Sequence, residues 1–268
     1  MAKRTIWAIA LFAFMLVVLA VRGVFLDILF AVVAIIAQIE IYRTMRKASF
    51  RPALWTALVF AVLILPVFMW KGLAGVVALF TLLSLINLFW SIFLPHRNYI
   101  DTILSIFIMF YPVWPLMFIL EINRIQPPAL SLLALILAIG CPVITDIAAF
   151  CVGVPFGKHK LIPRVSPKKT IEGAVGGAVI CTLVTIIFGW FYFRGNPVEV
   201  PFFHLPILGF VISVFSQGGD LAASAIKRFA GVKDFGNIIP GHGGVLDRLD
   251  SIVVSIVVVY CYFTLFIL

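Results

Sequence analysis

The chain has 268 residues, of which 63% are hydrophobic and only 12% charged, and its net charge is +9. Its mean hydropathy is +1.19, whereas a soluble globular chain contains about 25% charged residues. This composition excludes a soluble globular protein. Apolar runs of about 20 residues, without strand-type alternation, predict a membrane protein built of helices rather than a membrane β-barrel.

Nine apolar runs predict an all-α, polytopic fold of about nine transmembrane helices. The expected spans are residues 5–21, 24–42, 53–70, 72–94, 102–120, 129–151, 173–193, 206–226 and 249–268. The third and fourth spans are so close that a tight hairpin is expected at Trp70–Gly72. We expect residues 1–268 to form a single transmembrane domain, with N-terminal spans in 1–128 and the spans and loops that carry the chemistry in 129–268.

Lysine and arginine are distributed unevenly between the two sides of the expected bundle. Sixteen of the 20 lie at the N-terminus or in the loops after the second, fourth, sixth and eighth spans. The other four are Arg22, Lys71, Arg124 and Arg194. Because cytoplasmic loops carry the excess of positive charge, the N-terminus and both polar loops are expected in the cytoplasm and the C-terminus outside. This bias and anionic lipid explain the net charge without nucleic acid, for which the chain has no motif.

The densest polar stretch runs from residue 220 to residue 250. If residues 220–228 are helical, Asp220, Ser224, Lys227 and Arg228 share one face. The segment 240–244, Pro-Gly-His-Gly-Gly, opposes helix formation and predicts a tight loop that a ligand can approach closely. Carboxylates, cations and glycines in this arrangement are typical of a site for a metal-bound polyphosphate.

A second polar stretch spans residues 145–173. Asp146 lies inside an apolar run, where a carboxylate is costly unless it faces a cavity or a partner. Ser166 to Glu172 resembles a helix start, and a helix N-terminus beside Lys168 and Lys169 can hold a phosphate. The alternatives are a basic surface against anionic lipid for the loop and a structural hydrogen-bond role for Asp146.

Other polar residues are expected to be structural. Glu40 is expected to reach the cytoplasmic interface, and Asn87 to bond a neighbouring helix. Asp101 and Arg97 are expected to pair in a loop. Loop roles are expected for His96 and His204, and packing roles for the cysteines, Cys141, Cys151, Cys181 and Cys261.

Both polar stretches resemble the phosphatidate cytidylyltransferase (CDP-diacylglycerol synthase) family. The match comprises Ser224, Lys227-Arg228, Lys233-Asp234, Pro240-Gly-His-Gly-Gly244 and Asp247-Arg-Leu-Asp250, together with Thr145-Asp146, Phe156–Leu161, Ser166–Thr170 and Glu172-Gly173. It covers about the last half of the chain. The family often has other residues at Ala223, Phe235, Ala148 and Phe150, which puts ligand roles at those positions in doubt.

The resemblance implies transfer of CMP from CTP to phosphatidic acid by a multi-pass enzyme of the inner (plasma) membrane whose site faces the cytoplasm. It implies Mg²⁺, with room for a second cation, and suggests a homodimer. The implied catalytic residues are Asp220, Asp247, Lys168, Lys227 and Arg228. The implied substrate-binding residues are Lys169, Arg164, Ser166, Ser224, His242, Gly243, Gly244 and Arg248. The implied metal ligands are Asp220 and Asp247, with Asp146 and Asp250 as weaker candidates. For Asp247, a helix N-cap role is the alternative.

Two other functions remain open. Another lipid-headgroup phosphotransferase, of the CDP-alcohol phosphatidyltransferase type, would carry a compact aspartate cluster that this chain lacks. A membrane anion transporter would distribute ionisable residues across several spans, whereas here they concentrate in two loops.

Overall fold

The computed structural model describes residues 13, 15–93, 98–196, 200–239 and 243–268. Seven helices within these residues are long and apolar enough to cross a membrane, so the chain is an all-α, multi-pass membrane protein. The elements are α2 (Gly23–Lys47), α3 (Leu54–Ile92), α4 (Tyr99–Phe110), α5 (Val113–Asn123), α6 (Pro128–Phe156), β1 (Lys160–Ile162), β2 (Ser166–Thr170), α7 (Ile171–Gly195), α8 (His204–Phe229) and α9 (Leu246–Phe266).

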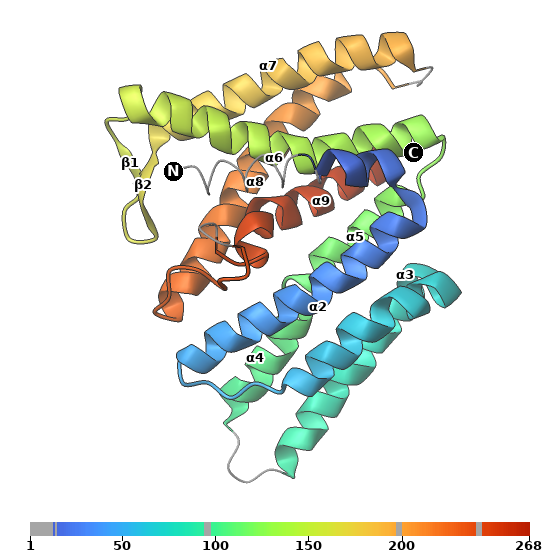
Figure 1. The fold of residues 1–268 in the computed structure, drawn as a ribbon, viewed down its shortest axis with the longest axis vertical. Helices are drawn as coiled ribbons and strands as arrows, with labels where there is room; N and C mark the ends of the chain where they lie inside the picture. Colours follow the sequence, from blue (N-terminus) through green and yellow to red (C-terminus); the bar gives the residue numbers. More distant parts are fainter. Residues whose placement is uncertain (1–12, 14, 94–97, 197–199, 240–242) are drawn as a thin grey trace. The chain divides into compact units, whose positions relative to one another are not determined.

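Helix α3 contains two of the expected spans. Gly72 is not helical (φ 62°, ψ −155°), and the two limbs fold back on each other (Figure 1). The rings of Trp55 and Trp90 are 6.1 Å apart, and those of Phe60 and Phe80 are 5.7 Å apart. The expected hairpin is therefore confirmed, because rings on the two sides of the turn meet across it.

The remaining spans agree approximately with the expected nine. Helices α4 and α5 form one span, interrupted where Pro112 follows the extended Tyr111 (φ −103°, ψ 127°), as expected because proline disfavours helical conformation before it. Most of the first expected span, residues 5–21, lies outside the described residues. The seven helices, with α3 counted as two limbs, account for the other expected spans.

Contacts divide the chain into two units, and the expectation of a single domain remains a prediction. One unit comprises Met1–Met117 and Lys227–Arg248, and the other comprises Phe118–Ile226 and Leu249–Leu268.

In the first unit, polar bonds tie the two limbs of α3 to each other and to α4. Asn87 donates to the carbonyl of Leu83 and to the sulfur of Met109 on α4, and Thr56 donates to its amide oxygen, so its expected interhelical bond is confirmed. Asp101 accepts from the backbone N–H of Arg51 at 2.7 Å. Its expected partner, Arg97, lies outside the described residues, as does His96.

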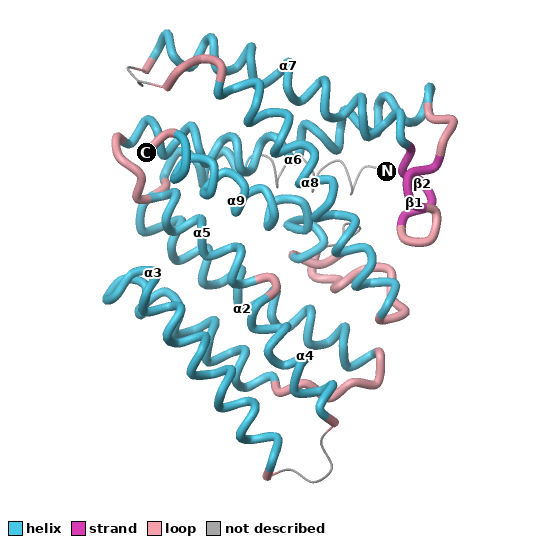
Figure 2. The backbone as a smooth tube through the Cα atoms, turned by 180° about the vertical axis from the view of Figure 1, so that it is seen from behind, coloured by secondary structure: helices cyan, strands magenta, loops and turns pink. Residues whose placement is uncertain are grey.

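In the second unit, α6 and α7 pack closely along glycines of α7. A Cβ at Gly173 would lie 2.7 Å from the carbonyl oxygen of Ala149, and one at Gly177 would lie 3.0 Å from that of Thr145. Such small residues let membrane helices approach at the backbone. The hairpin β1–β2 connects the two helices (Figure 2).

Two expectations for single residues are resolved in the second unit. His204 does not lie in a loop but begins α8, where its Nδ1 lies 2.9 Å from the hydroxyl of Tyr262. The four cysteines are free thiols, of which Cys141 and Cys181 are buried.

Candidate active site

In the first unit, the polar stretch begins where α8 ends. The N–H of Gly231 donates to the carbonyl of Arg228, and that of Val232 donates to the carbonyl of Lys227. Gly231 has φ +66°, the left-handed conformation that closes a helix in this bonding pattern and that glycine adopts without strain. The turn sends the chain away from α8 directly after the basic pair Lys227 and Arg228.

Asp247, in the first turn of α9, holds the segment that follows this turn. Its Oδ1 accepts from Lys227 Nζ at 2.8 Å, and its Oδ2 accepts from the backbone N–H groups of Phe235 at 2.8 Å and Gly244 at 2.9 Å. The side chain of Asp247 is 2% exposed and that of Lys227 is 11% exposed. The ammonium also lies 5.2 Å from the centre of the Phe235 ring. The carboxylate thus gathers three separate parts of the polar stretch around a buried ion pair.

The N-cap alternative for Asp247 does not hold, because α9 begins at Leu246, one residue before Asp247. Asp247 lies inside α9, and its backbone partners precede the helix. The amides at the start of the helix, that of Val245 just before it and that of Leu246, its first residue, donate instead to Glu40 on α2 at 3.0 and 2.8 Å. The expectation that Glu40 reaches the interface is therefore wrong, since Glu40 is 1% exposed. Its acidity was visible in the sequence, but nothing there indicated a partner 205 residues away.

In the second unit, the basic loop forms the hairpin β1–β2, and the expected helix start at Ser166 is wrong. Residues 166–170 are strand β2, and α7 begins at Ile171 with Thr170 accepting from the N–H of Gly173 at 3.2 Å. The expected acidic residue of the first turn, Glu172, accepts from the backbone N–H of Lys158 at 3.1 Å and lies 2.6 Å from His159 Nδ1. The pairing of β2 with β1 explains the shift, because it keeps residues 166–170 extended.

The side chain of Lys169 leaves the hairpin to form an ion pair with Asp220 on α8. Both are partly exposed, and Ser224 lies one turn further along α8. Beside Asp220, a Cβ at Gly219 would lie 2.8 Å from the backbone oxygen of Asp250. The backbones of α8 and α9 therefore approach closely next to two of the aspartates.

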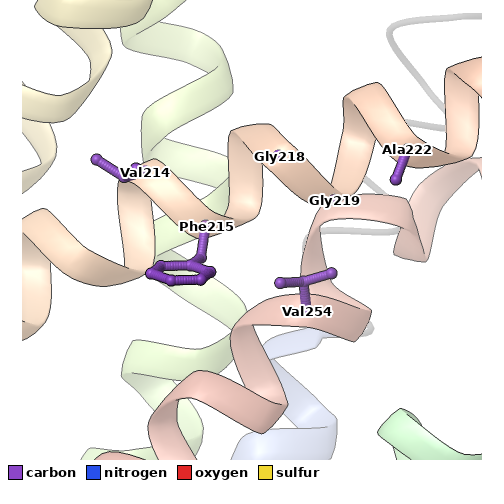
Figure 3. A pocket seen from close by; sticks show the side chains of 6 residues that line it. All are labelled: Val214, Phe215, Gly218, Gly219, Ala222 and Val254. Atoms are coloured by element: carbon purple, nitrogen blue, oxygen red, sulfur yellow. The ribbon is translucent and has the colours of Figure 1, made fainter.

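An apolar pocket of about 360 Å³ opens along the same part of α8 and α9. Figure 3 shows its walls, with side chains from both helices. The lining residues are Val214, Phe215, Gly218, Gly219, Ala222 and Val254. The pocket lies in the second unit, and its lining residues on α8 lie on both sides of Asp220 in the sequence.

Within each unit, the structure brings some of the expected site residues together. Lys227, Gly244 and Asp247 meet in the first unit, and Lys169 and Asp220 meet in the second. Gly243 has φ +87°, and a Cβ there would lie 2.9 Å from Asp247 Oδ2. The exposed site residues are Arg164, Lys168, Arg228, Arg248 and Asp146. His242 lies outside the described residues.

Among the described residues, no three His, Cys, Asp or Glu side chains are grouped so that they could hold a metal ion. Three of the departures from the expected motif are buried, Phe235 at 2%, Ala223 at 0% and Ala148 at 5% exposure, whereas Phe150 is 71% exposed. Phe235 nevertheless contributes to the cluster, through its N–H to Asp247 and its ring beside Lys227.

Comparison with known proteins adds the family. A model of the cytidylyltransferase family matches residues 2–266. A phosphatidate cytidylyltransferase of Bacillus subtilis (strain 168) is 44% identical over 128 residues, which are 47% of this chain and 46% of that protein. One of Staphylococcus haemolyticus is 47% identical over 108 residues, 40% of each chain. An uncharacterised protein of Escherichia coli (strain K12), YnbB, is 38% identical over 153 residues, which are 56% of this chain and 47% of that protein. The matches thus span about half the length of these relatives.

Proposed function

Because the chain belongs to the cytidylyltransferase family, we propose that it transfers the cytidylyl group of CTP to phosphatidic acid in the membrane. The observation that carries the proposal is the buried Lys227–Asp247 pair, which fixes the loop of the family motif next to the exposed cations Arg228 and Arg248. A loop held this firmly by its backbone, with cations beside it, is suited to binding phosphates in one orientation.

The reaction needs little covalent chemistry from the protein. A phosphate oxygen of phosphatidic acid attacks the α-phosphorus of CTP, the bond to the bridging oxygen breaks, and pyrophosphate leaves with the electron pair. The attacking oxygen is already ionised near neutral pH, so a strong general base is not required. The barrier arises from bringing two polyanions together, and fixed cations lower it by positioning and neutralising them.

We assign roles to the site residues on this basis. Lys168, Lys227 and Arg228 stabilise charge on the reacting phosphates. Asp220 and Asp247 act with them, Asp220 through Lys169 and Asp247 through Lys227 and the loop. The residues that contact substrate phosphates or approach them by their backbone are Arg164, Ser166, Lys169, Ser224, His242, Gly243, Gly244 and Arg248.

The available donors fit a magnesium ion that shares its coordination with the substrate. Mg²⁺ is commonly held by one or two carboxylates together with substrate phosphates and water, so a group of three acidic side chains is not needed. Asp220 is partly exposed and suits this role, with Asp250 and Asp146 as further ligands. Asp247, the other expected ligand, has both oxygens bonded to Lys227 and to loop amides, so we propose that it holds the loop rather than the ion. When bound, Mg²⁺, alone or with a second cation, supplies charge neutralisation at the phosphates.

The membrane setting follows from the substrates. Phosphatidic acid keeps its acyl chains in the bilayer while CTP arrives from water, so the site must lie at an interface. We place that interface on the cytoplasmic side of the inner (plasma) membrane, with the N-terminus also inside, because of the 16-to-4 division of Lys and Arg. We propose a homodimer on the family resemblance alone.

The test uses the purified full chain in detergent with CTP, phosphatidic acid and Mg²⁺. The proposal expects CDP-diacylglycerol by mass spectrometry, with no product when diacylglycerol replaces phosphatidic acid or a chelator removes the metal. Transport of anions by reconstituted vesicles without turnover would favour the transporter instead. Use of CDP-diacylglycerol as donor to an alcohol would favour the other phosphotransferase class.

A further inference from the structure

Helix α2 holds the polar loop of the first unit although it lies far from the family motif in the sequence. Glu40 Oε1 accepts from the N–H of Val245 and Oε2 accepts from that of Leu246. One turn later, the hydroxyl of Thr44 lies 3.0 Å from the carbonyl oxygen of Glu40 and 3.4 Å from that of Phe235, so it shares its one proton between the helix and the loop. Two side chains on one face of α2 therefore contact the segment between α8 and α9, at Phe235 and at the start of α9.

The loop is built to admit the Glu40 carboxylate. A Cβ at Gly236 or at Gly244 would lie 2.4 Å from Glu40 Oε1. Any larger residue at either position would have to displace a buried carboxylate, since Cβ atoms essentially never approach a neighbour this closely. The two glycines thus allow the loop backbone to close on Glu40 from two directions.

The same short segment connects Glu40 to the Lys227–Asp247 pair. Gly244 donates its N–H to Asp247, and the next two amides donate to Glu40. Phe235 donates its N–H to Asp247 and accepts from Thr44 through its carbonyl. Glu40 and Asp247 therefore hold neighbouring peptide groups, and movement of one carboxylate must move the donors of the other.

We propose that Glu40 is a positioning residue for cytidylyl transfer, which fixes the first turn of α9 and thereby the place of Asp247 and Lys227. The inference rests on the proposed function for its kinetic consequence, but not for its structural one. Glu40 is 1% exposed and both its oxygens are bonded to backbone amides, so it acts through the loop and does not touch substrate. A glutamate bonded to helix N-terminal amides is also favoured by the helix dipole.

The kinetic test compares Glu40→Gln and Glu40→Ala with Gln38→Met. Glutamine can accept from only one of the two amides and presents an NH₂ group to the other. Gln38 is fully buried on the same helix, and its amide has no hydrogen-bond partner among the described residues, so its replacement controls for general disturbance of α2. Each variant is checked for a cooperative thermal transition before its rates are compared.

We expect both Glu40 variants to lower kcat at least about tenfold, the factor for one lost hydrogen bond to a charged group. We expect KM for CTP and for phosphatidic acid to stay within about threefold, because Glu40 contacts neither substrate. Gln38→Met should keep kcat within about twofold. Near-normal kcat in folded Glu40→Gln, or an equal loss in Gln38→Met, would overturn the proposal.

Hydrogen exchange supplies a second measurement that does not depend on turnover. In Glu40→Gln and Glu40→Ala, amides in residues 243–247 should exchange at least about tenfold faster than in the unmodified chain, whereas peptides of α6 and α7 should be unchanged. Unchanged protection of residues 243–247 would overturn the positioning role. If the unmodified chain lacks turnover, the proposed function fails, and the exchange result still decides whether Glu40 fixes the loop.

Discussion

Replacement of Lys227 by methionine tests whether the buried ion pair organises the loop. The substitution keeps much of the aliphatic length but removes the ammonium that lies 2.8 Å from Asp247 Oδ1. Asp247, with 2% of its side chain exposed, would then be a buried charge without its counter-ion. Breaking such a pair by removing one partner costs about 3–5 kcal/mol.

The cost should appear as a lower melting temperature in detergent. At about 2–4 °C per kcal/mol for a chain of this size class, we expect a decrease of roughly 6–20 °C. The exposed Lys160 provides a matched control, and Lys160→Met should change stability by no more than about 0.5 kcal/mol. The double variant Lys227→Met/Asp247→Asn should be more stable than the sum of the two single changes predicts, by about 1–3 kcal/mol. If Lys227→Met melts within about 2 °C of the unmodified chain, the pair does not hold the loop.

Three further predictions follow from the same contacts. Gly244→Ala should destabilise the chain by about 1–3 kcal/mol because its Cβ would meet Glu40, whereas Gly140→Ala, where a Cβ meets nothing within 4 Å, should be neutral or stabilising in the same thermal melts. Lys168→Ala and Lys169→Ala should each lower CTP turnover at least about tenfold with melting retained, and Lys160→Ala should not; normal turnover in both would leave the hairpin as a lipid-facing surface. In oriented vesicles, with Cys151 and Cys261 replaced by serine, single cysteines at positions 168 and 242 should be labelled from the cytoplasmic side and one at 268 from the other; labelling of 168 and 242 from opposite sides would contradict the topology.

The helices could be predicted from the sequence because the bilayer demands long apolar runs, and their lengths leave few alternatives. The hairpin in α3 was also predictable, since Gly72 lies between two such runs. The start of α7 was misplaced because Ser166 and Glu172 have helix-start chemistry. The pairing of Lys160 with Thr170 instead keeps the chain extended as far as Thr170.

The site was predictable in its residue types but not in its bonding. The spacing placed Lys227 and Asp247 in one polar stretch. It could not show that both oxygens of Asp247 accept hydrogen bonds from Lys227 and from backbone amides of the same stretch. Glu40 was misassigned because an acidic residue near a helix end commonly reaches water. Its actual partners are backbone amides, which every residue except proline carries and no sequence pattern distinguishes.

The bond cleaved in CTP tests the proposed reaction most directly. The purified chain is incubated with phosphatidic acid and CTP labelled with ³²P at either the α- or the γ-phosphorus, and the lipid and aqueous phases are then separated. Cytidylyl transfer predicts that the α-label enters the lipid as CDP-diacylglycerol and that the γ-label remains in water as pyrophosphate. Entry of the γ-label into lipid, or retention of both labels in intact CTP, would contradict it.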